Sequence, residues 1–469
     1  MAITQISHNQ TFGNWISVKD YGAVGDGVTD DTQAFVDALN ASSVYISVYV
    51  PPGVYLLNDC VHVYQKSNIT IHMDRSAKII KPAGWVTAGA IPGPAVPPPP
   101  RQVPGFDTVG AKALVANVVL AFQQCTDVQI TGGQIDGVTT PLNPYNGYGI
   151  KFFDSDRVII DGVRIFNFGG EGVLIEQTDN VTITNCTVSN CNHGINPFQQ
   201  SADNRYIGNY ISDCAAYGFF IEGTRNSVFQ SNTIVNCQTP FVLKNTVGVG
   251  DIFNIIISGN YCLNDEATEG VKLDSSDTDT SFGYVLIDSN IFLGSLKNGI
   301  IKDSDQGTAV VTNNILFGVG ESGQNSQGFA RCDIVANNYL DVNNDGVTSA
   351  LLCGSVTNNI FNGVDINPWG NNKSPDQCTL VKGNYPYSSN VAYVNSSSPT
   401  INGKETVINR DTGPSTITGF EDGELGQIVR LTSAKADTVT LSHNSGSSTY
   451  PFIFRSGSDK TINGPGDRY

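Results

Sequence analysis

Carboxylates and a lysine recur at one position of a repeated segment in the middle of the chain. Aligned by their glycines, the segments place Glu222, Lys244 and Asp274 at successive equivalent positions. Hydrolysis of a glycosidic bond uses one carboxylic acid to protonate the leaving oxygen and one carboxylate to activate water or attack the sugar. A lysine between two acids keeps one ionised, while a neighbour crowded by like charge stays protonated. The sequence therefore predicts Glu222 and Asp274 as a catalytic pair. Asp303 is a substitute, and Glu176 is an outlying candidate.

The segments that carry these residues read as short strands. They are GYGIKFFD (147–154), EGVLIEQ (171–177), HGINPFQ (193–199), YGFFIEG (217–223), TPFVLKN (239–245), EGVKLDS (269–275) and NGIIKDS (298–304). Side chains alternate along a strand. The apolar residue after each glycine (or after Pro240) therefore faces a core: Ile150, Val173, Ile195, Phe219, Phe241, Val271 and Ile300. The fourth residue faces outward: Phe153, Glu176, Phe198, Glu222, Lys244, Asp274 and Asp303.

The spacing between strands sets the expected distances between these acids. Parallel strands pair about 4.8 Å apart, so Glu222 and Asp274 are expected two rungs, or about 9.5 Å, apart at Cα. Leaning side chains bring that separation into the roughly 6.5–9.5 Å range of inverting glycosidases. Asp274 and Asp303 lie one rung apart, which is closer to the roughly 5–5.5 Å of retaining enzymes.

Aromatic and basic side chains near these positions are candidates for substrate binding. Exposed aromatic faces suit the apolar faces of pyranose rings, and the candidates are Phe153, Phe198, Phe220 and Trp369. Packing between subunits explains these rings equally well. Lys244 and Lys272 are the basic candidates. His193 is either a proton shuttle or, as we favour, a structural hydrogen-bonding group.

Two other functions remain open at this point. Elimination by a polysaccharide lyase needs a uronic acid, a base and a group that neutralises the carboxylate, often Ca²⁺. The candidate bases are Lys151, Lys244, Lys272, Arg205 and Arg225. A hydrolase needs no cofactor, whereas a lyase would be expected to use Ca²⁺. The third possibility is a non-enzymatic receptor-binding adhesin.

Short alternating runs joined by Asn or Gly recur from residue 127 onward and predict the fold. The joints lie 21 to 30 residues apart, at Gly133, Gly162, Asn185, Asn209, Asn232, Asn260, Asn290, Asn314, Asn338 and Asn359. This period suits a coil of three short strands, and coils bury their apolar faces only by stacking. Asn tolerates the left-handed conformation of a sharp bend and hydrogen-bonds to the Asn of the next coil. The main rival solenoid is the leucine-rich repeat, but its Leu-rich consensus is missing from this sequence. A parallel β-helix is therefore predicted.

Residues 17–31, SVKDYGAVGDGVTDD, followed by TQAFVDALNA and VYVPPGVYLL, resemble the entry segment of the pectate-lyase-like right-handed β-helix superfamily. The pattern is most like phage tail-spike and polysaccharide depolymerase proteins. The resemblance implies an all-β, single-stranded right-handed parallel β-helix whose capping helix starts at Asp30, Asp31 and Thr32. It also implies a homotrimer that binds and cleaves a bacterial surface polysaccharide. Similar tail spikes often use a Glu with an Asp-x-x-Asp pair, so Asp274-Ser275-Ser276-Asp277 adds Asp277 to the catalytic candidates.

The chain divides into three predicted parts. Residues 1–57 form the entry segment and capping helix, and residues 58–395 form the β-helix. Within the β-helix, the Pro-rich stretch 82–112 is expected to project as a loop. Residues 396–469 are expected to form a small antiparallel β cap or stem, because solenoids need covered ends.

Composition limits the partners and the compartment. The net charge of −17 argues against nucleic acid as a partner, and no apolar stretch is long enough to span a bilayer. The ten Cys show no metal spacing and predict buried free thiols. The N-terminus lacks the pattern of a signal peptide. Together with the resemblance, the absence of this pattern favours a virion tail protein that acts outside the host cell. A secreted bacterial enzyme is the alternative.

Overall fold

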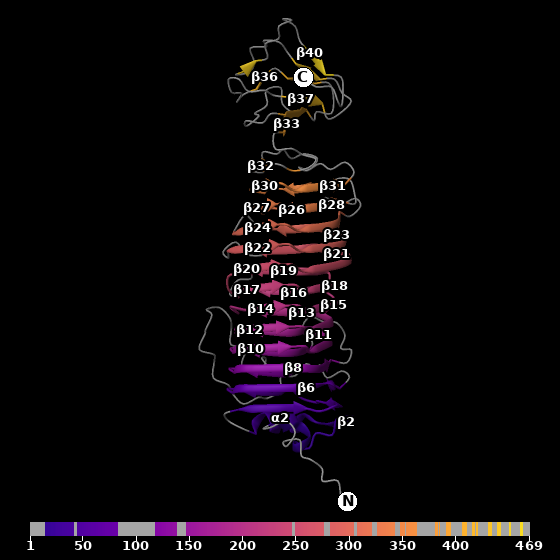
Figure 1. Cartoon of the computed structure of the whole chain (residues 1–469), viewed down its shortest axis with the longest axis vertical. Helices are drawn as coiled ribbons and strands as arrows, with labels where there is room; N and C mark the ends of the chain where they lie inside the picture. Colours follow the sequence, from indigo (N-terminus) through magenta and orange to yellow (C-terminus); the bar gives the residue numbers. More distant parts are fainter. Residues whose placement is uncertain are drawn as a thin grey trace, which may run out of the picture.

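The computed structural model describes most of the chain from residue 15 to residue 363, and short strands beyond it (Figure 1). The described ranges are 15–41, 45–82, 118–137, 147–245, 249–275, 282–303, 307–320, 326–342, 348–351, 353–363, 380–382, 384, 391–394, 406–409, 415–417, 419–420, 430–433, 439–441, 450–451 and 460–462. From residue 83 onward, the predicted Pro-rich loop 82–112 lies outside these ranges, as do the candidates Asp277 and Trp369.

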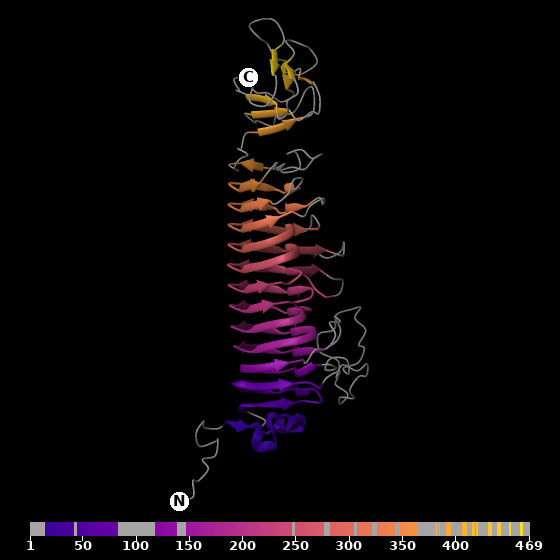
Figure 2. The ribbon, with the colours of Figure 1, turned by 90° about the vertical axis from the view of Figure 1, so that its right-hand side faces the viewer.

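Strands β1 to β32 pair in parallel, and their coils stack along the long axis of the molecule (Figures 1 and 2). Each full coil contributes strands to three faces. Equivalent residues stay in register from coil to coil, as Ile195, Phe219 and Phe241 show on the third face. The predicted parallel β-helix is confirmed.

The three faces are defined by their strands. The first face contains β1 (Ile16–Ser17), β3 (Ile46–Val50), the start of β6 (Ser67–Ile80), the start of β8 (Thr126–Asp136), β10 (Asp156–Asp161), β12 (Asp179–Thr184), β14 (Arg205–Ile207), β17 (Arg225–Gln230), β20 (Phe253–Ser258), β22 (Tyr284–Asp288), β24 (Thr308–Thr312), β27 (Ile334–Ala336), β30 (Ser355–Thr357) and β32 (Leu380–Lys382). The second contains β2 (Asp26–Asp30), β4 (Gly53–Leu56), the ends of β6 and β8, the starts of β11 (Arg164–Glu176), β13 (Thr187–Phe198), β21 (Tyr261–Ser275) and β23 (Ile291–Lys302), and β15 (Tyr210–Ser212), β18 (Thr233–Val235), β25 (Ile315–Val319), β28 (Tyr339–Val342) and β31 (Ile360–Gly363). The third contains β5 (Val61–Tyr64), β7 (Val118–Gln123), β9 (Tyr148–Phe153), β16 (Tyr217–Glu222), β19 (Thr239–Asn245), β26 (Gln327–Ala330), β29 (Thr348–Leu351) and the ends of β11, β13, β21 and β23.

A short helical cap closes the N-terminal end of the core (Figure 1). Helix α2 (Thr32–Asn40), which follows the 3₁₀ turn η1 (Val18–Tyr21), buries Ala34, Phe35, Ala38 and Leu39. Asp30 Oδ1 accepts from the Thr32 amide at 3.0 Å, as expected of a residue at the helix start. Asp31 does not cap the helix. Its buried carboxylate accepts from the amides of Val24 (2.6 Å) and Gly25 (3.1 Å), so it stabilises the glycine-rich turn before β2.

A column of buried asparagines runs up one corner of the core. Each side-chain oxygen accepts from the backbone amide of the equivalent residue one coil earlier, as Asn290 does from Asn260 (3.0 Å); for Asn209 that residue is Cys186. Each side-chain nitrogen donates to a backbone carbonyl, as Asn290 does to Ile257 (2.9 Å). The members are Asn209, Asn232, Asn260, Asn290, Asn314, Asn338, Asn359 and Asn384. The predicted hydrogen bonding between coils is confirmed.

The conformational role predicted for these asparagines belongs to their neighbours. The residue before each ladder asparagine from Asn209 to Asn359 takes the left-handed backbone, for example Ser231 (φ 54), Ser289 (φ 58) and Asn313 (φ 58). Asn185 (φ 53) is itself one of these left-handed residues, and Cys186 lies in the column below Asn209. The left-handed residue turns the chain, and the next side chain therefore points into the core.

Two further predictions concern thiols and membranes. The cysteines within the described ranges are free, and all of them except Cys60 are buried, as expected. No helix in the part of the chain that the structure describes is long and apolar enough to cross a bilayer.

Beyond the β-helix, the described strands form three small sheets. β33 (Val391–Val394), β34 (Thr406–Asn409) and β37 (Arg430–Ser433) pair in parallel. β35 (Ser415–Ile417) is parallel to β38 (Val439–Leu441), which is antiparallel to β40 (Lys460–Ile462). β36 (Gly419–Phe420) and β39 (Tyr450–Pro451) are antiparallel. The prediction of purely antiparallel pairing is wrong, because parallel pairing continues past residue 390.

Replacing Asn290 by alanine should lower the free energy of unfolding by about 1–3 kcal/mol, because the Asn260 amide and the Ile257 carbonyl lose a buried partner. Chemical denaturation followed by circular dichroism measures this loss. Asn40→Ala, at the exposed end of α2, is the control and should change stability by less than about 0.5 kcal/mol. Equal effects of the two substitutions would contradict a stabilising ladder.

Candidate functional site

The outward side of the third face carries the predicted catalytic stripe. Glu222 in β16 lies beside Lys244 in β19, and Lys244 lies beside Asp274 in β21. The residues predicted to face inward on the same strands, such as Phe219, Phe241 and Val271, are fully buried. The alignment inferred from the repeat is therefore the alignment in the fold.

Asp274 and Asp303 converge on Lys272. The Lys272 Nζ lies 3.3 Å from Asp274 Oδ2 and 3.5 Å from Asp303 Oδ2. Because both oxygens lie within 3.5 Å of one nitrogen, they are no more than about 7 Å apart. The structure thus joins Asp274 to Asp303 through a lysine that projects from the same strand as Asp274.

The surroundings of this cluster shift the protonation of two of its members. Partial burial raises the pKa of Asp303 above its ordinary value; the nearby carboxylates of Asp274 and Glu269 add to the rise, while Lys272 opposes it. Burial lowers the pKa of Lys272, but Asp274 and Asp303 more than offset that effect, so it is raised overall. The Asp303 side chain is 40% exposed, which limits the size of its shift.

Three other predicted residues of the stripe are less suited to catalysis. Glu222 is buried, two rungs from Asp274, with Lys244 between them. Glu176 forms a buried ion pair with Lys151, with 2.8 Å between Oε2 and Nζ, and this pairing occupies a predicted acid and a predicted lyase base. Phe153 is only 5% exposed and offers no free face to a sugar. Phe198 and Phe220 remain partly exposed.

A second column on the third face was not identified as a site from the sequence. Glu171, His193 and Tyr217 lie side by side on successive coils, at the position before each glycine. His193 Nδ1 lies 3.1 Å from Glu171 Oε1, and its ring stacks on Tyr217 with centroids 5.1 Å apart. Within the described ranges, Glu171 Oε2 is buried without a hydrogen-bond partner. The signal was present in the segments EGVLIEQ, HGINPFQ and YGFFIEG, whose first letters are these three residues.

This column adjoins the acid cluster electrostatically. Burial raises the pKa of Tyr217, and the charges of Asp274, Glu269 and Glu222 add to the rise, while Lys272 opposes it. The imidazole of His193 is held at both nitrogens, because Asn192 Nδ2 lies 3.1 Å from its Nε2. The structural role favoured for His193 agrees with these contacts. The third face therefore presents acids, a lysine, a phenol and an imidazole along consecutive rungs.

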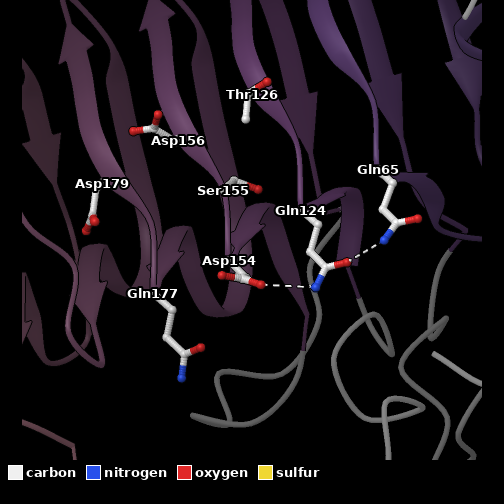
Figure 3. Close-up of a pocket in the computed structure, with 8 residues that line it drawn as sticks. All are labelled: Gln65, Gln124, Thr126, Asp154, Ser155, Asp156, Gln177 and Asp179. Carbon is white, nitrogen blue, oxygen red and sulfur yellow. Dashed lines mark hydrogen bonds between the residues drawn. The ribbon is translucent and has the colours of Figure 1, made fainter. Parts of the chain in front are cut away.

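A polar groove of about 770 Å³ lies elsewhere, along the corners that follow β5, β7, β9 and β11 (Figure 3). Its lining is Gln65, Gln124, Thr126, Asp154, Ser155, Asp156, Gln177 and Asp179. Gln65 Nε2 donates to Gln124 Oε1, and Gln124 Nε2 donates to Asp154 Oδ2, both at 3.0 Å. None of the predicted site residues lines this groove. The acid–lysine cluster is the better candidate active site.

The described residues include no group of three or more His, Cys, Asp or Glu side chains arranged to hold a metal ion.

Two family models match the chain. One describes a right handed beta helix region and covers residues 119–316. The other, described as rhamnogalacturonase A/epimerase, pectate lyase-like, covers residues 15–90. The chain therefore contains a right-handed β-helix region and, before it, a segment that matches the pectate-lyase-like model. The predicted fold class is confirmed, and both models support the predicted resemblance.

Similar proteins include surface and phage proteins. Plasmin and fibronectin-binding protein A of Streptococcus pneumoniae is 43% identical over 68 residues, which are 14% of this chain and 9% of that protein. The pre-neck appendage protein of Bacillus phage B103 is 28% identical over 266 residues, 53% of this chain and 25% of that protein. The matched stretches thus correspond to no more than a quarter of either relative. The tailspike protein of E. coli bacteriophage HK620, solved with a pentasaccharide, shares the fold: the TM-score is 0.52 at 12% identity, over 92% of this chain and 82% of that chain.

Replacing Lys272 by methionine should raise the pKa of Asp303 further, because the ammonium group that favours the ionised carboxylate is removed. Carboxyl ¹³C NMR of aspartate-labelled protein, titrated with pH, measures the shift. Lys78→Met removes a lysine whose partner is Asp136, on another face, and should leave Asp303 unchanged. A lower or unchanged Asp303 pKa in Lys272→Met would contradict the cluster.

Proposed function

We propose that this β-helix is a tail-spike depolymerase, which binds a bacterial surface polysaccharide along its third face and cleaves it by glycoside hydrolysis. The observation that carries the proposal is the arrangement of Asp274 and Asp303 on adjacent strands, both in contact with Lys272. Two carboxylates held in unequal environments are what glycosidic hydrolysis needs.

We assign the roles of acid and nucleophile from the surroundings of the two carboxyl groups. Asp303, with its raised pKa, keeps a proton to higher pH and serves as the acid that protonates the glycosidic oxygen. Asp274, whose Oδ2 lies 3.3 Å from the Lys272 ammonium, serves as the nucleophile. The leaving sugar departs with the proton of Asp303, and the deprotonated Asp303 then activates the water that releases the glycosyl group from Asp274. One strand spacing of about 4.8 Å suits the roughly 5–5.5 Å separation of a retaining enzyme.

This assignment revises the pair predicted from the repeat. Glu222 and Asp274 were expected to cooperate across Lys244, but Lys272 couples Asp274 to the opposite neighbour. The partly exposed Phe198 and Phe220, with Lys244, are proposed to contact the bound glycan along the same face. His193 lies 4.7 Å from Phe220, centroid to centroid, and supports that ring.

Similar proteins support the location as well as the substrate class. The phage relative is a pre-neck appendage protein, and the structural neighbour is a tailspike solved with a pentasaccharide. We infer a place in a virion tail, with the bacterial surface polysaccharide as the partner. A polysaccharide lyase is the second candidate, because the phenol of Tyr217 and the amine of Lys272 are possible bases on the same face.

Asp274→Asn and Asp303→Asn should each lower the rate of polysaccharide cleavage at least about 100-fold, because each removes an acid–base or nucleophilic group. Release of new reducing ends from surface polysaccharides of a bacterial panel measures the rate. Glu222→Gln is the matched control and should retain most activity. A larger loss in Glu222→Gln than in Asp303→Asn would favour the original pair instead.

The products and the binding distinguish the other functions. A product that absorbs in the ultraviolet from a new double bond would indicate a lyase. Binding without cleavage of any glycan in the panel would indicate an adhesin. The pH dependence gives an independent check: cleavage should fall as pH rises through the pKa of Asp303, and Lys272→Met should move that fall to higher pH.

We also propose that the chain forms a homotrimer, as the resemblance implies. The outward side of the second face supports self-association, because one column contains Tyr210, Thr233, Tyr261, Ile291, Ile315, Tyr339 and Ile360 in register. Tyr210, Tyr261 and Ile360 are 44%, 39% and 44% exposed. A partly exposed column of this length that is mostly tyrosine and isoleucine is typical of an interface.

Tyr261→Glu combined with Ile315→Glu should dissociate the trimer, because two charges per chain would be buried in the interface. Light scattering after size-exclusion chromatography measures the mass. Tyr284→Glu, at an equally exposed tyrosine of the first face, should leave the mass unchanged. A monomeric parent protein would contradict the proposed assembly.

A further inference from the structure

An aromatic corner, formed by Trp15, Tyr49 and His72, lies on the first face among the coils of β3, β6 and β8. His72 in β6 stacks on Tyr49 in β3, with centroids 5.9 Å apart and planes inclined by 13°. Trp15, directly before β1, meets His72 edge-on at 6.1 Å and 70°. The rings line a pocket of about 330 Å³. Tyr49 and Trp15 are partly exposed and His72 is exposed, so solvent reaches the pocket.

The rest of the pocket is polar and neutral. Thr70, Gln129 and Thr131 complete its lining. Thr131 Oγ1 lies 2.8 Å from His72 Nδ1, which fixes the orientation of the imidazole. Thr70 and Gln129 are neighbours in the β6–β8 register and lie side by side on the outer surface. The pocket thus combines flat apolar rings with hydroxyl and amide groups that both donate and accept hydrogen bonds.

A second hollow of about 560 Å³ continues from this pocket across the coils. The two share Thr70 and Gln129. The hollow extends along Asp127, Arg157, Ile159, Asn180 and Thr182, on β8, β10 and β12. From β3 to β12 there are five parallel strands, which span about 19 Å. This length accommodates an extended chain of several sugar units.

We propose that the aromatic corner and its continuation form a second carbohydrate-binding site, specific for neutral pyranose chains. Aromatic faces bind the apolar faces of sugar rings, and amide and hydroxyl groups bind their hydroxyls. Arg157 is occupied by Asp127, with 2.7 Å between its Nε and Oδ1, and so adds no unpaired positive charge for a uronate. Asp74, whose charge reaches Tyr49 and His72, would repel an acidic sugar.

This site is separate from the acid–lysine cluster. It lies on the first face and on the first coils, whereas Asp274 and Asp303 lie on the third face and much later coils. Neither hollow contains an acid paired with a lysine as in that cluster. The site therefore binds glycan without cleaving it, and holds a long polysaccharide while the third face acts on another part of the same chain or on a neighbouring one.

The test uses the full chain carrying Asp274→Asn and Asp303→Asn, so that no probe is consumed. The probes are maltohexaose, cellohexaose, mannohexaose and chitohexaose, with hexagalacturonate as the acidic comparator, and binding is measured by isothermal titration calorimetry. At least one neutral probe should bind, at least tenfold more tightly than hexagalacturonate. Trp15→Ala and Tyr49→Ala should each weaken that binding at least tenfold.

Two further variants separate the site from general effects. Gln129→Ala changes an exposed side chain without touching the core, and should weaken binding several-fold even if Trp15→Ala impairs folding. Tyr210→Ala removes an exposed tyrosine on the second face and should leave binding unchanged. Absence of neutral binding, equal loss in Tyr210→Ala, or preference for hexagalacturonate would overturn the proposal. Because the acids are already removed, failure of the hydrolysis proposed for the third face would leave this result unaffected.

Discussion

Parallel pairing between successive coils is the constraint on which the other features depend. It places equivalent side chains of successive coils about 4.8 Å apart. A column of like residues therefore repeats the same favourable or unfavourable contact at every coil. Inside, the asparagine ladder satisfies this constraint, because each carboxamide both accepts from and donates to backbone groups of neighbouring coils. Outside, a column of like charges would repel itself. The third face limits this repulsion by placing lysines beside its acids, as Lys151 lies beside Glu176 and Lys272 beside Asp274 and Asp303.

The lysines of the third face stabilise its acids, and they also set which acids can exchange protons. Lys151 neutralises Glu176 within a buried pair, and that pair is fully occupied. Lys272 instead serves two carboxylates at longer and more exposed contacts, so neither acid is fully compensated. Partial burial raises the pKa of Asp303, and Lys272 offsets only part of that rise. Pairing with lysine therefore stabilises Glu176, whereas it leaves Asp303 able to exchange its proton.

The outer surfaces of the three faces differ in a way that suits a fibre-like glycan-binding protein. The second face exposes a column of tyrosines and isoleucines, the third carries the ionisable groups, and the first has an aromatic corner followed by polar residues. The faces of a β-helix can differ in function because the backbone hydrogen bonds between coils do not depend on the outward side chains. Outward positions are then free to vary without loss of the fold.

Much of the fold follows from the sequence, because strand alternation and the coil period are local properties. The inward and outward parity of residues such as Phe219 and Glu222, the register of Glu222 with Lys244 and Asp274, and the asparagine ladder were all predicted in this way. The position of the left-handed residue was misplaced by one, since a run of two adjacent turn-forming residues does not show which of them points inward.

What only the tertiary structure decided is the choice of partner for each side chain. A lysine on an outward column can reach either neighbouring coil, and the sequence does not state which; Lys272 contacts both Asp274 and Asp303. Whether an outward ring is exposed is also decided by the fold: Phe153 is buried, whereas Phe198 and Phe220 on the same face are partly exposed. The aromatic corner joins Trp15, Tyr49 and His72, residues that lie far apart in the sequence and become neighbours only when the first coils stack.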